Sequence, residues 1–114
     1  MHFDGDVIRS RQNKNLVELC KLTDRKARQN GRIFRFDGIK LLEEAVAKSL
    51  EIVTVFLRES DAGKIVFGLQ NRLQNLEFDK IGKILVVADD VFDRVSEEKS
   101  PEGVITIAKY IDKF

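Results

Sequence analysis

The sequence predicts a single α/β domain, a three-layer α/β/α sandwich around a four-stranded sheet that is mostly parallel or mixed. Short apolar runs rich in β-branched residues alternate along the chain with amphipathic stretches of helical length. The 114 residues suit one domain, and no internal repeat or linker rich in Gly, Ser or Pro divides them. We therefore expect residues 1–114 to form one domain, with about 1–6 as a flexible tail.

The first predicted element is a helix over about 13–29. Asn13 or Asn15 can cap its start, and Leu19 and Cys20 belong to its apolar face together with a leucine one turn earlier. Because the single cysteine falls on that face, we expect a buried, inert thiol rather than a nucleophile.

Four strands and three further helices follow in alternation. The runs that predict strands combine β-branched and aromatic residues, and they cover 32–36, 52–57, 83–88 and 104–110. The run IVTVFL at 52–57 shows no polar alternation, which is typical of a strand buried on both faces. Apolar residues at helical spacing predict the remaining helices over 39–49, about 60–74 and 91–95.

Motifs of catalytic, nucleotide-binding and metal sites are missing from the chain. There is no glycine-rich phosphate loop and no nucleophile elbow, and His2 and Cys20 alone cannot form a structural zinc site. The adjacent carboxylates are best interpreted as solvated faces and helix caps, at 43–44, 89–90 and 97–98. We expect the 114 residues to hold no cofactor and no metal. No apolar run is long enough to cross a membrane, and a lone cysteine is compatible with a cytoplasmic location.

The net charge of +1 hides a strong asymmetry along the sequence. Residues 1–35 carry nine basic and four acidic side chains, whereas residues 36–114 carry eleven basic and fifteen acidic ones. The N-terminal third is therefore +5 and the remainder −4, a pattern that indicates a surface facing a polyanion. Cations near a helix C-terminus are also favourable without any ligand, so the cluster at 25–28 has a purely structural explanation as well.

Two ordered sets of residues give the chain a specific resemblance. The first runs from Ile8-x-Ser10-x-x-Asn13 through Arg28 to Gly31-x-x-Phe34-x-x-x-Gly38 and Leu41-Leu42-x-Glu44-Ala45. The second comprises Val91-Phe92-Asp93-x-Val95-Ser96 and Lys99-Ser100-Pro101-x-Gly103-Val104. Together they resemble the N-terminal substrate-binding domain of the SpoU/TrmH class of RNA ribose 2′-O-methyltransferases. Asp37 and Lys14 depart from the usual pattern, where Glu and Pro are common.

The resemblance implies a fold similar to ribosomal proteins that bind kinked RNA, and a role in capturing structured RNA, ribosomal or transfer RNA. It implies a C-terminal knotted methyltransferase domain outside these 114 residues, which binds S-adenosylmethionine and pairs into a homodimer. We therefore expect the 114 residues to be inactive alone. The alternative is a protein-interaction or dimerisation module that packs on its catalytic domain and has no RNA affinity of its own.

The predicted RNA contacts are cations, together with one amide and one glycine at helix starts: Arg11, Asn13, Lys14, Arg25, Lys26, Arg28, Arg32, Gly38 and Lys40. The cations would contact phosphates, which gives affinity but little sequence information. Gly38 lies where backbone N–H groups at a helix start can meet a phosphate. Ser10 and Asn13 can bond to RNA or cap the first helix. Phe34 and Phe36 fit the core or a stacked base.

Overall fold

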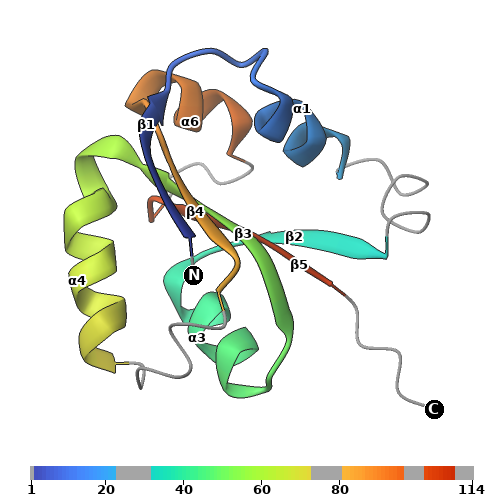
Figure 1. Ribbon diagram of the computed structural model, residues 1–114, viewed down its shortest axis with the longest axis vertical. Helices are drawn as coiled ribbons and strands as arrows, with labels where there is room; N and C mark the ends of the chain where they lie inside the picture. Colours follow the sequence, from blue (N-terminus) through green and yellow to red (C-terminus); the bar gives the residue numbers. More distant parts are fainter. Residues whose placement is uncertain (1, 23–31, 73–80, 97–101, 110–114) are drawn as a thin grey trace.

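The computed structural model describes residues 2–22, 32–72, 81–96 and 102–109. Within them a mixed five-stranded sheet has the order β1-β4-β3-β5-β2 (Figure 1). Its strands are β1 (His2–Ile8), β2 (Ile33–Asp37), β3 (Glu51–Arg58), β4 (Lys83–Val87) and β5 (Val104–Lys109). The strands β1, β4 and β3 are parallel, whereas β5 runs antiparallel to both β3 and β2.

Helices cover both faces of this sheet. The helices α3 (Ile39–Ala47) and α4 (Ala62–Arg72) pack on one face, and α1 (Lys14–Lys21) and α6 (Asp89–Val95) pack on the other. A short 3₁₀ helix, η1 (Glu59–Asp61), leads from β3 into α4. The three-layer α/β/α class predicted from the sequence is confirmed.

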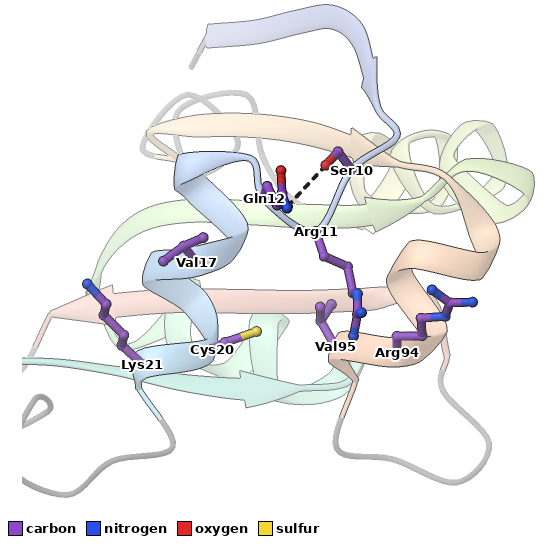
Figure 2. A pocket seen from close by; sticks show the side chains of 8 residues that line it. All are labelled: Ser10, Arg11, Gln12, Val17, Cys20, Lys21, Arg94 and Val95. Carbon is purple, nitrogen blue, oxygen red and sulfur yellow. Dashed lines mark hydrogen bonds between the residues drawn. The ribbon is translucent and has the colours of Figure 1, made fainter.

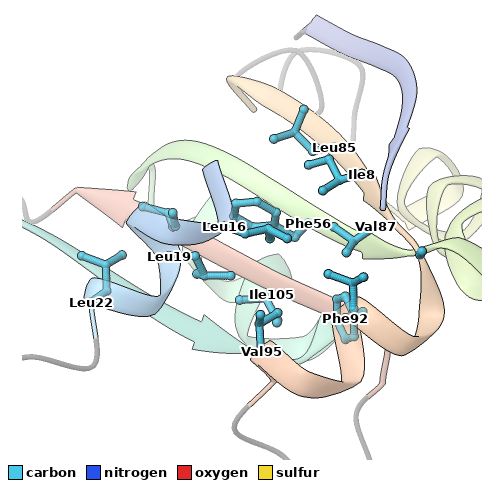
Figure 3. Close-up of a cluster of buried hydrophobic side chains, with 13 residues drawn as sticks. Ile8, Leu16, Leu19, Leu22, Phe56, Leu85, Val87, Phe92, Val95 and Ile105 are labelled. Atoms are coloured by element: carbon cyan, nitrogen blue, oxygen red, sulfur yellow. The ribbon is translucent and has the colours of Figure 1, made fainter. Parts of the chain in front are cut away.

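The central strand β3 supplies side chains to both cores. Val55 and Leu57 face α3 and α4, while Phe56 faces α1 and α6, because successive side chains of a strand point to opposite faces. Figure 3 shows Phe56 beneath α1, beside Leu16. Burial on both faces confirms what the unbroken apolar run at 52–57 predicts.

The prediction of four strands was short by one. Residues 2–8 form β1, which pairs in parallel with β4 at one edge of the sheet and occupies most of the segment expected to be a tail. The sequence Asp4-Gly5-Asp6 is typical of a turn and hides the strand. The pairing is irregular at that point, with a register shift between Phe3 and Val7.

The helix α1 also differs from its prediction. It ends at Lys21 rather than near residue 29, and residues 23–31 lie outside the described part. Its buried face consists of Leu16 and Leu19, continued by Leu22 just past the last turn. Since that face turns away from Cys20, the thiol is exposed, and the expectation of a buried cysteine is wrong.

Candidate nucleic-acid interface

A hollow of about 660 Å³ lies between α1 and α6, on the face of the sheet that these two helices cover. Among the residues that the structure describes, three cations line it: Arg11 from the turn after β1, Lys21 from the end of α1, and Arg94 from α6. The other lining residues are polar or apolar: Ser10, Gln12, Val17, Cys20 and Val95. None of the eight is acidic. Figure 2 shows Arg11 reaching from its turn towards α6, where Arg94 and Val95 lie.

The turn that carries Arg11 is held by local hydrogen bonds. The Gln12 backbone N–H donates to Ser10 Oγ at 3.1 Å, and the Asn13 N–H donates to the Ser10 carbonyl at 3.2 Å. Asn13 is the N-cap of α1, and its Oδ1 accepts from the Asn15 N–H at 2.9 Å. The capping role proposed for Asn13 is confirmed. These bonds fix the conformation of the turn after β1, and they therefore fix the position of the Arg11 backbone.

The helix α6 is fastened to the end of β3 by Arg58. This guanidinium forms a bidentate pair with Asp93, with Nε and Nη2 each 2.9 Å from a carboxylate oxygen. Its Nη1 lies 2.8 Å from Ser60 Oγ and 3.1 Å from Asp89 Oδ2. Asp89 in turn accepts from the Ser60 N–H and hydroxyl at 3.0 and 2.6 Å.

These contacts shift three acid–base equilibria. The hydrogen bonds from Arg58 lower the pKa of Asp93, and those from Ser60 lower the pKa of Asp89. The bonded carboxylate of Asp93 raises the pKa of Arg58 above its ordinary value. All three groups are thus held in their charged forms.

A second attachment holds the C-terminal end of α6. The Arg35 side chain is only 5% exposed, and its Nη2 donates to Asp37 Oδ1 at 3.2 Å and to the Val95 carbonyl at 3.1 Å. Ser96 Oγ donates to the other oxygen of Asp37 at 3.1 Å. Because both ends of α6 are tied to the sheet, Arg94 projects from a fixed helix.

The predicted RNA contacts lie in different parts of the fold. Arg11 lines the hollow, while Lys14 is exposed at the start of α1. Arg32 is exposed just before β2, and Lys40 is exposed on α3, in the opposite layer from α1. Arg25, Lys26 and Arg28 lie outside the described residues. The structure therefore places Arg11 and Lys14 on one side of the sheet and Lys40 on the other.

Two backbone N–H groups at the start of α3 already have partners. The Gly38 N–H donates to the Val104 carbonyl at 3.1 Å, and the Ile39 N–H donates to Glu102 Oε1 at 3.3 Å. Gly38 has φ of 115°, and a Cβ there would be 3.0 Å from the same Glu102 oxygen. The Glu102 carboxylate thus occupies the place where a phosphate was predicted to bind.

Sequence reasoning missed Lys21 and Arg94 as members of this group. Lys21 is one of the nine basic residues of the N-terminal third, but the sequence pattern alone does not predict that it contacts RNA. Arg94 belongs to the acidic remainder of the chain, 83 positions after Arg11, so only the fold reveals that the two line one hollow.

The described residues contain no cluster of three His, Cys, Asp or Glu placed to hold a metal ion. Within the same residues, no helix is both long and apolar enough to cross a membrane.

One family of known proteins matches the sequence. The match is to the MRM3-like substrate binding domain, and it covers residues 13–106. Among curated protein sequences, none matches this chain.

Solved structures share the fold at low sequence identity. An rRNA methyltransferase from Sinorhizobium meliloti superposes with a TM-score of 0.72 at 19% identity, over 97% of this chain and 38% of that one. An RNA 2′-O ribose methyltransferase gives 0.70 at 23% identity, over 96% and 39%. The SpoU methyltransferase AviRb from Streptomyces viridochromogenes, in complex with AdoMet, gives 0.68 at 16% identity, over 88% and 36%. This chain therefore spans a little over a third of each structure.

Proposed function

Since the chain belongs to the family of MRM3-like substrate-binding domains, we propose that it captures structured RNA, ribosomal or transfer RNA, for an RNA 2′-O-methyltransferase. The family assignment agrees with the resemblance found in the sequence. The observation that carries the proposal is the hollow between α1 and α6, where three cations meet and none of the lining residues that the structure describes is acidic. Affinity for RNA comes chiefly from its phosphates, which pair with such cations.

Each cation has a distinct part in this proposal. The guanidinium groups of Arg11 and Arg94 can each bond a phosphate through two parallel N–H groups, whereas Lys21 adds a compact charge. Lys14, exposed at the start of α1 between the lining residues Gln12 and Val17, would meet a neighbouring phosphate. Contacts of this kind hold and orient an RNA strand without reading its sequence.

Methyl transfer in this proposal belongs to a catalytic domain outside the chain, which would use S-adenosylmethionine and pair as a homodimer. That cofactor would supply an electrophilic methyl group on a sulfonium. The hollow between α1 and α6 does not fit it, because Arg11, Lys21 and Arg94 would repel the cationic sulfur. The chain's own contribution is thus to hold RNA. Such a role suits a cytoplasmic protein.

The proposal is tested by replacing Arg11, Lys21 and Arg94 together with Ala. Counterion release gives each phosphate contact about a fivefold effect near physiological salt, so the triple variant should bind structured RNA about a hundredfold more weakly. The matched control replaces three exposed lysines elsewhere, Lys48, Lys64 and Lys109, with Ala. Fluorescence anisotropy with a labelled tRNA or rRNA fragment measures both. Equal losses in the two variants would contradict a specific role for the hollow.

One observation favours protein contact at a different place. An apolar hollow of about 210 Å³ lies beside β2 and α3, lined mainly by Phe34, Phe36, Leu41 and Leu50, and Leu41 is 49% exposed. Phe34 and Phe36 contact each other, with ring centroids 5.7 Å apart. This surface suits packing on a catalytic domain, and Leu41→Glu should then separate the domain from its catalytic partner in a pull-down while RNA affinity stays unchanged. If the catalytic domain captures Leu41→Glu as well as it captures the wild type, this surface is not the contact with the catalytic domain.

A further inference from the structure

A second hollow, of about 570 Å³, lies next to the hollow between α1 and α6 and has a different chemistry. Ser10 and Gln12 line both hollows, so the two meet at the turn after β1. Part of the lining of the second hollow is apolar, from Val7, Ile8 and Leu85. Part of it consists of side-chain amides, from Gln12, Asn13 and Asn15. Of the lining residues that the structure describes, the two charged ones, Asp6 and Arg9, already have other partners, and Arg9 Nη2 lies 3.3 Å from Glu59 Oε2. We call it the amide hollow.

The hydrogen bonds fix the orientation of two of these amides. Asn13 Oδ1 accepts from the Asn15 N–H at 2.9 Å, and Asn15 Oδ1 accepts from Lys83 Nζ at 3.1 Å. Both neighbours can only donate, so each amide must present its oxygen to them. The two Nδ2 groups donate to no group within the part of the chain that the structure describes. Both asparagines therefore keep N–H donors for a ligand in the amide hollow.

Apolar walls with N–H donors suit a flat base that carries hydrogen-bond acceptors. On the edge that carries N7, guanine presents two adjacent acceptors, N7 and O6, whereas adenine presents N7 beside the N6 amino donor. Two asparagine donors thus match guanine and meet one unfavourable donor on adenine. A phosphate gains nothing from contact with apolar side chains. It fits the hollow between α1 and α6, which lies on the other side of Ser10 and Gln12 and is lined by cations.

We propose that the amide hollow binds an unpaired base of the same RNA strand whose phosphates occupy the hollow between α1 and α6, and that it prefers guanine to adenine. This inference rests on the proposed function. It adds recognition of a base to phosphate contacts, which do not depend on the RNA sequence. Splayed, single-stranded bases in loops and bulges are the usual targets of sequence-specific RNA recognition.

The test uses RNA hairpins whose uridine loops differ in one central base: guanine, adenine or inosine. Inosine keeps N7 and O6 but lacks the 2-amino group, so it should bind like guanine. A matched pair of hydrogen bonds discriminates between bases by about tenfold or more, so guanine and inosine should each bind about tenfold more tightly than adenine.

The matched variant is Asn13→Asp. Aspartate keeps the N-cap bond to the Asn15 N–H but replaces the Nδ2 donor with an acceptor. The ratio of guanine to adenine affinity should fall to about one or invert, because the carboxylate favours the adenine amino group. Gln70→Glu on α4, an exposed site in the other layer, adds the same charge and should leave the ratio at its original value.

The outcomes separate this inference from the proposed function. Salt-dependent binding with equal affinity for guanine and adenine, or an unchanged ratio in Asn13→Asp, would overturn the inference and leave RNA capture standing. Absence of binding to every hairpin and to structured RNA would overturn both.

Discussion

Two charged groups on the α1 and α6 side of the molecule, one around Arg58 and one in the hollow, give their cations opposite surroundings. Arg58 at the end of β3 lies within 4 Å of three carboxylates, those of Asp61, Asp89 and Asp93. Arg11, Lys21 and Arg94 instead share a hollow in which no acidic residue occurs among the described lining residues. The helix α6 contributes to both, with Asp93 in the first group and Arg94 in the second.

This difference separates a structural cation from one available to a ligand. The charge of Arg58 is used to hold α6 against the sheet, and a phosphate there would compete with three carboxylates. In the hollow, a phosphate would find cations without that competition. Two neighbouring residues of one short helix can therefore serve the fold and the ligand separately.

Among single substitutions, the largest effect is expected when an acidic residue, the kind of partner that Arg58 has, is placed in the hollow. Arg94→Glu removes one phosphate contact and adds a carboxylate beside Arg11, so RNA affinity should fall about thirtyfold. Lys64→Glu on α4 makes the same charge change in the other layer and should cost less than about threefold. Anisotropy titrations measure both, and similar losses in the two variants would show that total charge alone governs binding.

Removing Arg58 should lower the stability of the fold and leave RNA affinity nearly unchanged. In Arg58→Ala, the contacts to Ser60 and Asp89 are lost together with the bidentate Asp93 pair, and loss of that pair should lower the free energy of unfolding by about 1 kcal/mol. Chemical denaturation at neutral pH measures this change. RNA affinity of the folded variant should stay within about twofold, and a larger loss of affinity would mean that Arg58 also contacts the ligand.

The ion pairs around Arg58 should also make stability depend on pH in the acid range. The pKa values of Asp93 and Asp89 are lowered in the folded state, so their stabilisation is present above the unfolded value near 3.9 and is lost as pH falls through the folded values. Denaturation curves of the wild type and Arg58→Ala should therefore converge between about pH 5 and pH 2. Asp89 should keep part of its shift in the variant, because its main cause is Ser60. A stability difference that stays constant over this range would exclude the ion pairs as its source.

The smallest effect is expected at a cation outside both groups. Lys40 is exposed on α3, across the sheet from the hollow, and it was predicted to contact RNA from its place in the helix's first turn. If the hollow is the main contact, Lys40→Ala should change RNA affinity by less than about twofold. A tenfold loss in the same titration would move the interface towards α3.

Local patterns in the sequence predicted most of the fold. Apolar runs such as 52–57 and helical spacing such as that of Leu42, Ala45 and Val46 located β3 and α3 within about two residues. The strand β1 was missed because Asp4-Gly5-Asp6 looks like a turn, and only pairing with β4 shows it to be an irregular strand. Cys20 was misplaced because Leu16, Leu19 and Leu22 alone define the buried face of a short helix.

The candidate site was predicted only in part. The charge asymmetry indicated Arg11, but Arg94 lies in an acidic stretch and joins the hollow through the packing of α6. The network around Arg58 was equally hidden, since Asp93 follows 35 positions later and no local spacing connects them. Contacts over such separations depend on the order of strands in the sheet, which the sequence pattern did not determine.

Cys20 offers the most direct test of where RNA binds, because it is the single cysteine of the chain, is exposed and lines the hollow beside Lys21. Its rate of reaction with a thiol reagent such as DTNB can be followed with increasing RNA at low salt. If RNA occupies the hollow, the rate should fall several-fold in step with binding measured by anisotropy, and high salt should restore it. An unchanged Cys20 rate at RNA concentrations that saturate the protein would contradict binding at the hollow.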